Sequence, residues 1–187
     1  MKSRTPIAVT ALLALALAGC DPAVKSDWER KNQPLLDKEQ AEKMPALPAY
    51  PRRGALLEFE VRAGRDIRYY IDGATLNVDD QGVVRYSLVV RTLSGAENVS
   101  YEGINCKTDE FRVYALGHAD GTWGGRAGGW RPIAESRQPQ HRVLQRQYFC
   151  QRDAPLSDAD DMRRALREGG NPWARNFGAD SLRGLGR

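Results

Sequence analysis

The sequence predicts a mainly β (α+β) fold: an antiparallel β-meander or sandwich-like sheet with one or two short C-terminal helices and one disulfide. Three observations lead to this fold class. Apolar and polar residues alternate over several segments between residues 58 and 116, turn-forming residues separate those segments, and an amphipathic helical pattern follows residue 157. Alternation indicates half-buried strands, because successive side chains of a strand point to opposite faces of the sheet.

The first 19 residues are expected to be a lipoprotein signal peptide. Lys2 and Arg4 precede an apolar run over residues 7–18 that is too short to cross a bilayer as a helix. The run ends in Leu17-Ala18-Gly19-Cys20, which resembles the bacterial lipobox. In proteins with that motif the cysteine is acylated, with palmitate among the chains, and becomes the new N-terminus. The alternative is an ordinary cleaved signal peptide with an incidental cysteine.

We therefore expect Cys20 to anchor the chain to a membrane on the periplasmic side of a bacterial cell envelope, since several acyl chains suffice for stable attachment. Whether the inner or the outer membrane is used stays open. Residues 20–54 are expected to form the lipidated end and a Pro-rich tether, extended at about 3.1 Å per residue. Within it, residues 47–51 are expected to be polyproline-like and to lie on the domain surface.

Composition and cysteine usage narrow the possible partners. The formal net charge of +4 includes Lys2 and Arg4 of the signal peptide, so the remaining basic excess is small and no nucleic acid is expected as partner.

Cys106 and Cys150 are expected to pair in an oxidising compartment. Two free buried thiols or a metal site are the alternatives, although His118 and His141 are not spaced as ligands. No metal and no cofactor are expected.

The predicted strands follow in order along residues 55–155, the expected β-rich domain. The first covers residues 58–63, where Phe59, Val61 and Ala63 alternate with charged residues, and short strands are expected at 68–71 and 76–78. A turn at residues 79–82 leads to the strongest strand, residues 84–91, and a second turn at Ser94-Gly95 follows it.

The next two strands complete an antiparallel meander. They cover residues 96–105 and 110–116, and the second carries Phe111, Val113 and Ala115 on one face. Glu102 falls in the polar phase of the first, so we expect it to point outward to a cross-strand arginine such as Arg85 or Arg112.

The C-terminal part, residues 156–187, is expected to be a helix and a flexible tail. Residues 143–149 fit either a helix or a last strand, which Cys150 would join to the sheet. Ser157 fits the N-cap of the following helix, which ends at Gly169-Gly170. The tail after it is expected to be poorly ordered unless Trp173 and Phe177 pack on the domain.

Seven segments between residues 82 and 150 stand in an order that resembles the CNP1-like family. The resemblance covers roughly residues 45–155 and implies one exported domain with a paired cysteine. It implies no activity and no catalytic residues. The segments are Gly82-Val83-Val84-Arg85-Tyr86, Asn98-Val99-Ser100-Tyr101-Glu102-Gly103-Ile104, Cys106, Tyr114-Ala115-Leu116-Gly117, Asp120-Gly121-Thr122-Trp123, Trp130-Arg131-Pro132-Ile133 and Tyr148-Phe149-Cys150.

A Gly-rich stretch over residues 120–131 and its surroundings form the candidate binding surface. Between residues 111 and 152 the chain has seven arginines against two acidic residues, which favours an anionic headgroup, peptidoglycan or an acidic partner. The alternatives are a flexible surface loop and a solvated face neutralised by other strands. The candidate residues are Trp123, Arg126, Trp130, Arg131 and Glu102.

The leading hypothesis for function is a non-enzymatic binding or structural module. Its expected partner, besides the membrane reached through the lipid, is an envelope protein or a cell-wall component. One alternative is an envelope hydrolase that uses Glu102 or His118, although no nucleophile elbow or phosphate-binding loop occurs. Another is a small-ligand or lipid carrier, which requires a cavity of at least about 300 Å³.

Overall fold

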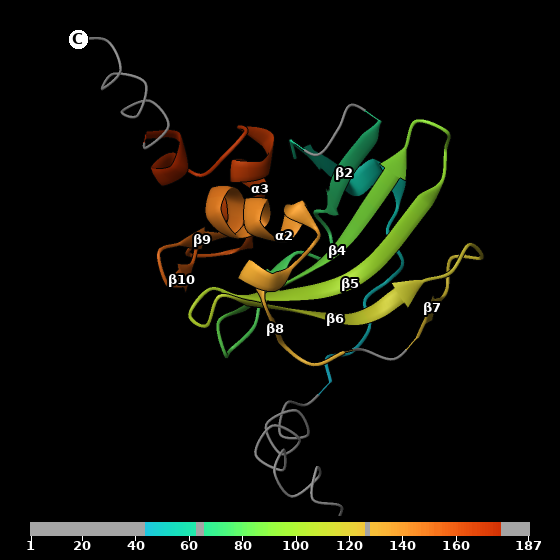
Figure 1. Ribbon diagram of the computed structural model, residues 1–187, viewed down its shortest axis with the longest axis horizontal. Helices are drawn as coiled ribbons and strands as arrows, with labels where there is room; N and C mark the ends of the chain where they lie inside the picture. Colours follow the sequence, from blue (N-terminus) through green and yellow to red (C-terminus); the bar gives the residue numbers. More distant parts are fainter. Residues whose placement is uncertain (1–43, 63–65, 126–127, 177–187) are drawn as a thin grey trace, which may run out of the picture. The chain divides into compact units, whose positions relative to one another are not determined.

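A computed structural model describes residues 44–62, 66–125 and 128–176 of the chain (Figure 1). The predicted signal peptide, Cys20, most of the tether and Arg126 lie outside the described residues. Within the part that is described, no helix is long and apolar enough to cross a membrane.

One antiparallel sheet of eight strands forms the body of the domain, which confirms the predicted fold class. Along the sheet the order is β1-β2-β4-β5-β6-β7, while β3 pairs with β4 and β8 with β6. The strands are β1 (Leu56–Phe59), β2 (Ile67–Asp72), β3 (Asn77–Val78), β4 (Val83–Thr92), β5 (Glu97–Asn105), β6 (Glu110–Gly117), β7 (Trp123–Gly124) and β8 (Arg131–Pro132).

The predicted meander is confirmed as β4, β5 and β6, the three long strands in the middle of Figure 1. The turn before β4 closes with the Gly82 amide donating to the Asp79 carbonyl at 3.0 Å, and Gly82 adopts φ 77°. Gly95 adopts φ 90° in the β4–β5 turn. Both positions need the positive φ that only glycine takes without strain.

Two details of the strands differ from the prediction. The first strand ends at Phe59 and not at residue 63, because its ladder to β2 runs only from Leu56 opposite Asp72 to Phe59 opposite Tyr69. In addition, an irregularity in the pairing of β5 with β6 at Tyr101 and Glu102 shifts the register. Ala115 therefore does not share a face with Phe111 but packs with Tyr101 and Tyr114 on the other side.

Helices cover one face of the sheet, as Figure 1 shows for the orange and red segments beside β4 and β5. The segment predicted as helix or strand is helical: α2 (Pro139–Val143) continues into a π-helix, η3 (Leu144–Phe149). α3 (Ala159–Arg167) buries Met162, Ala165 and Leu166. Its N-cap is Asp158, whose carboxylate accepts from the Asp161 amide at 2.8 Å, so the predicted cap at Ser157 is wrong by one residue.

Short elements complete the chain. They are the 3₁₀ helices η1 (Arg53–Ala55) and η2 (Ile133–Glu135) and a small antiparallel ribbon of β9 (Cys150–Gln151) and β10 (Ala154–Pro155). The apolar core lies between the sheet and the helices, and β2 and β4 contribute Tyr69, Ile71, Val84, Tyr86 and Leu88 to it.

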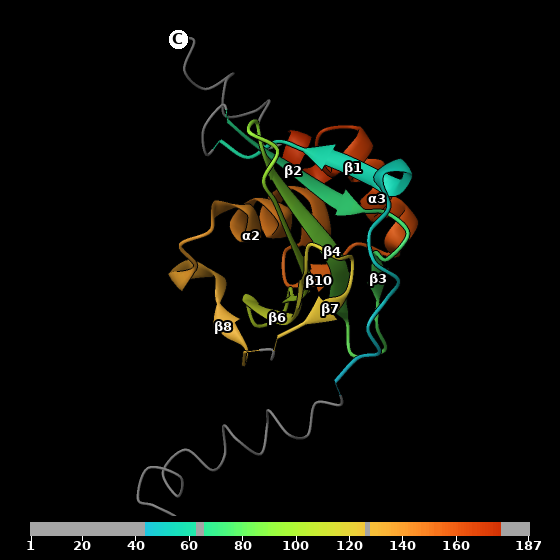
Figure 2. The same ribbon diagram turned by 90° about the vertical axis from the view of Figure 1, so that its right-hand side faces the viewer.

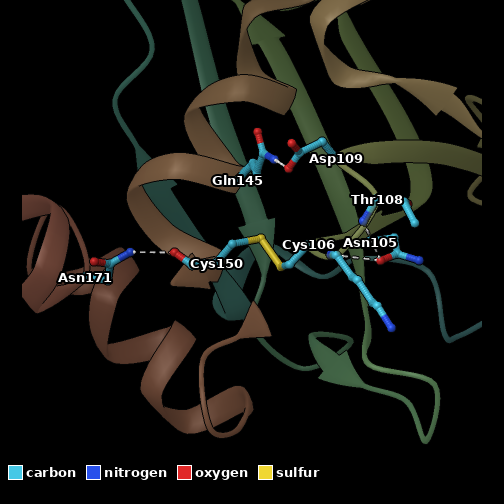
Figure 3. Close-up of a disulfide and its surroundings, with 8 residues drawn as sticks. Asn105, Cys106, Thr108, Asp109, Gln145, Cys150 and Asn171 are labelled. Atoms are coloured by element: carbon cyan, nitrogen blue, oxygen red, sulfur yellow. Dashed lines mark hydrogen bonds between the residues drawn. A yellow bond between two sulfur atoms is a disulfide. The ribbon is translucent and has the colours of Figure 1, made fainter. Parts of the chain in front are cut away.

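The predicted disulfide is confirmed and joins the sheet to the helical layer (Figure 3). Cys106 follows β5 and Cys150 follows η3, with their Cα atoms 5.7 Å apart. Beside the bond the Gln145 amide donates to the Asp109 carboxylate. On its other side the fully buried Asn171 donates to the Cys150 carbonyl at 3.3 Å, so the chain beyond α3 packs on the domain at this residue.

Residues 44–52, here called the strap, run along the face of the sheet opposite α2 (Figure 2, blue to cyan). The Trp123 indole donates to the Pro48 carbonyl at 2.8 Å, and the Tyr50 hydroxyl donates to the His118 carbonyl at 3.0 Å. A Cβ at Gly117 would lie 2.5 Å from the Tyr50 hydroxyl, so glycine is required for this approach. The polyproline-like segment therefore lies on the domain surface, as predicted.

Candidate functional site

A buried pair of ionisable side chains joins the helical layer to the centre of the sheet. Glu102 comes from the middle of β5 and His141 from α2, with 3.0 Å between Glu102 Oε2 and His141 Nε2. Glu102 is 2% exposed and His141 is fully buried. The Tyr86 hydroxyl donates to Glu102 Oε2 at 3.0 Å, and the Ser100 hydroxyl donates to Oε1 at 2.6 Å.

The prediction that Glu102 points outward to Arg85 or Arg112 is wrong. Alternation establishes which residues share a face, but it does not say which face the helices cover. In β5 the apolar phase with Val99 and Tyr101 faces the strap, and the polar phase with Glu102 faces α2. Burial of the carboxylate is tolerable because His141, Tyr86 and Ser100 all bond to it.

The surroundings of Glu102 determine its charge. Burial pushes its pKa upward, but the hydrogen bond and positive charge of His141, followed by the hydrogen bonds from Ser100 and Tyr86, outweigh this and hold the pKa below the ordinary value. Burial raises the pKa of Tyr86 well above its ordinary value, and the adjacent Glu102 charge adds to that. Tyr86 is therefore a neutral donor to a carboxylate that stays ionised at neutral pH.

Ser136 extends the network. Its hydroxyl oxygen lies 2.8 Å from His141 Nδ1, so serine, histidine and glutamate form a chain with the connectivity of a hydrolase triad. The histidine ring, however, stacks on Phe111 at 3.9 Å between centroids and has no exposed surface. The Ser136 hydroxyl is also bonded to the backbone of Gln138. A leaving group has no path to the imidazole, so the geometry suits a packing role better than acyl transfer.

A groove of about 550 Å³ opens beside this pair, on the same face of the sheet. The sheet forms its floor and contributes the apolar Leu88, Val90, Val113 and Leu116 together with Ser100 and Glu102. The loop before α2, residues 137–140, forms one wall. Two charged residues line the groove in the described part of the chain, Glu102 and Arg137. Glu102 is paired with His141, whereas Arg137 forms no ion pair with a described residue.

A family model described as the CNP1-like family matches residues 36–167, which is most of the chain. The chain belongs to the CNP1-like family. Neither a curated protein nor a solved structure matches it. The match covers the strap, the whole sheet, the Glu102–His141 pair and all of α3, so these elements together make up the CNP1-like domain.

In the CNP1-like domain, the described residues of the predicted binding surface do not lie on one face of the sheet. Trp123 and Trp130 lie on the strap face, in a row of rings that runs Tyr50–Trp123–Tyr101–Tyr114–Trp130 with centroids 5.1 to 6.4 Å apart. Arg131 stacks on Phe111 at 5.5 Å from the ring centroid. Glu102 is on the helical face, and Arg126 lies outside the described residues. Both tryptophans are half-buried and pack against the cluster of Tyr101, Tyr114 and Ala115.

The other residue named for catalysis, His118, does not join Glu102. It is exposed in the β6–β7 turn, where its backbone amide donates to the Thr122 carbonyl at 2.8 Å. The histidine that does meet Glu102 is His141, and no local pattern in the sequence marks it as that partner. No group of three metal-binding side chains occurs in the described ranges of the domain.

Proposed function

We propose that this chain is a lipid-anchored envelope protein whose CNP1-like domain is a non-enzymatic binding module. The ligand is an extended peptide segment of another envelope protein, with apolar side chains and an acidic group. The groove between the β4–β5–β6 floor and the loop before α2 is the observation that carries this proposal.

The floor of the groove favours apolar side chains. Leu116 is 52% exposed, and the half-buried Val90 and Val113 lie on the same face of the sheet. Covering apolar surface yields about 25 cal/mol per Å². Completing the burial of three such side chains supplies enough free energy for a specific, moderate interaction.

The wall of the groove favours an acidic group on the ligand. Arg137 lines it and forms no ion pair with any described residue, whereas the Glu102 carboxylate is hydrogen-bonded to His141. Arginine binds a carboxylate through two parallel hydrogen bonds, so one acidic side chain would set the direction of the peptide.

Binding accounts for the buried pair better than catalysis does. A general base needs a pKa near the working pH, but the pKa of Glu102 is lowered and both of its oxygens accept hydrogen bonds. We assign to the pair the role of holding α2 on the sheet, which keeps residues 137–140 in place as the groove wall.

Variants of the groove floor test this function. Leu116→Glu places a charge in the groove without disturbing the core, since the side chain is half exposed. We expect it to reduce the capture of envelope proteins from detergent-solubilised membranes by tenfold or more, measured by quantitative mass spectrometry. Leu93→Glu is the matched control, because Leu93 is 67% exposed in the β4–β5 turn and lies outside the groove.

A photo-crosslinking residue at position 138 should capture the same partner, whereas the same residue at position 93 should not. Equal capture by Leu116→Glu and Leu93→Glu would contradict the groove. Covalent labelling of Ser136 by a fluorophosphonate would favour the hydrolase.

The lipid anchor has its own test. Cys20→Ser is expected to move the protein from the membrane fraction to the soluble fraction, because the acyl chains are the proposed attachment. Mass spectrometry of the native N-terminus should find the acylated cysteine. An unmodified Cys20 in membrane-bound protein would show that the attachment has another cause.

A further inference from the structure

We propose a second binding site, for a primary alkylammonium group, in the cavity between the strap and the turn after β2, with Asp72 as its counter-charge. The cavity has a volume of about 520 Å³. It lies on the face of the sheet opposite the groove, because its wall contains Tyr101 whereas the groove contains the neighbouring Ser100 and Glu102.

Asp72 is the reason to expect a ligand here. The residue is only 2% exposed, at the end of β2, and it lines the cavity. One carboxylate oxygen accepts from the Ala74 amide at 3.0 Å. The other oxygen has no hydrogen-bond partner or ion pair among the described residues. Burial raises the pKa of Asp72, which the Ala74 hydrogen bond only partly opposes. This second oxygen is not among the enclosed unpaired polar atoms of the described residues, so it is reachable from the cavity that Asp72 lines and is the atom that a cationic ligand would meet.

The walls of the cavity suit a short alkyl chain that ends in a cation. Tyr50 and Tyr101 contribute aromatic rings, which attract an ammonium group placed over their faces. The rest of the lining combines the polar Thr75 and Asn77 with small apolar residues: Ala46, Pro48, Ala49, Ala55 and Ala74.

The charge pattern selects a cation over an anion. An ionised carboxylate only accepts hydrogen bonds, and an ammonium group offers three donors and a neutralising charge. Arg52 also lines the cavity, but it is exposed to solvent, and no ion pair joins it to Asp72 among the described residues. An anionic ligand drawn to Arg52 would have to meet the Asp72 carboxylate at the base of the cavity.

Titration of the full-length mature chain, made soluble by Cys20→Ser, with n-butylammonium tests the site. We expect saturable NMR shift changes at residues 72–77 and at Tyr101, while the neutral isostere 1-butanol gives none that saturate. Asp72→Asn is expected to weaken n-butylammonium binding at least tenfold. This variant should fold, with an equal or higher melting temperature at pH 7, because a carboxyl group with a raised pKa destabilises the folded state once it is ionised.

Two control variants distinguish binding at Asp72 from binding elsewhere on the domain. Arg52→Ala should leave the affinity unchanged or increase it, and Leu116→Glu should have no effect because the groove is on the other face. Equal binding of 1-butanol, full binding by Asp72→Asn, or loss of binding in Arg52→Ala would each overturn the proposal. Failure of the groove experiments leaves this site unaffected.

Discussion

Replacing His141 by alanine is expected to lower the free energy of unfolding by about 3 kcal/mol, because the change leaves the buried Glu102 carboxylate without one of its hydrogen-bond partners. Glu102 is 2% exposed, so its carboxylate is largely shielded from water in the folded domain. The Phe111 ring also loses its stacking partner at 3.9 Å. Urea denaturation of the purified domain-containing chain measures the effect.

His118→Ala is the matched control, since His118 is exposed in a surface turn. Its effect should stay within about 0.5 kcal/mol, as for most surface substitutions. Equal stability of the two alanine variants would show that the pair contributes nothing to folding.

The pH dependence of stability provides an independent readout of the same pair. A glutamate with a lowered pKa in the folded state stabilises the protein above its ordinary value of 4.5, and this stabilisation is lost as the pH falls through the folded pKa. Glu102→Gln should therefore flatten the stability profile below about pH 4.5 relative to the wild type. A profile unchanged by Glu102→Gln would contradict the assignment.

Removing the disulfide is the second change with a large expected effect. The double variant Cys106→Ala, Cys150→Ala opens a covalent link across a sequence separation of 44 residues. For a loop of this size the chain-entropy model gives a loss of about 4 kcal/mol. Urea denaturation of the wild type and the double variant under identical conditions should show this loss of unfolding free energy. The helical layer that follows β6 should lose the most stability.

Reductant provides the control for this experiment. The wild-type chain should approach the stability of the double variant after reduction under denaturing conditions and refolding, and the double variant should not respond to reductant. A double variant as stable as the oxidised wild type would show that packing alone holds η3 on the sheet.

The pair and the disulfide support the same segment at two points. His141 attaches α2 to the middle of β5, and Cys150 attaches the end of η3 to the residue after β5. Residues 137–140, the groove wall, directly precede α2. Losing either attachment should therefore weaken partner capture as well as stability, which links the fold to the proposed function.

The sequence by itself determined the meander, its two turns, the cysteine pair and the family. These features depend on local chemistry: alternation over β4 and β5, glycines at positive φ at Gly82 and Gly95, and two cysteines in the domain. Only the tertiary structure decided which face of each strand meets the helices. Alternation alone predicts that the polar phase of β5 faces solvent, yet Glu102 is buried because Tyr86, Ser100 and His141 converge on it. His141 lies 39 positions from Glu102 in the sequence, so no local pattern indicates that the two side chains meet. The same is true of the strap, which forms a wall of the cavity that Tyr101 and Asp72 also line.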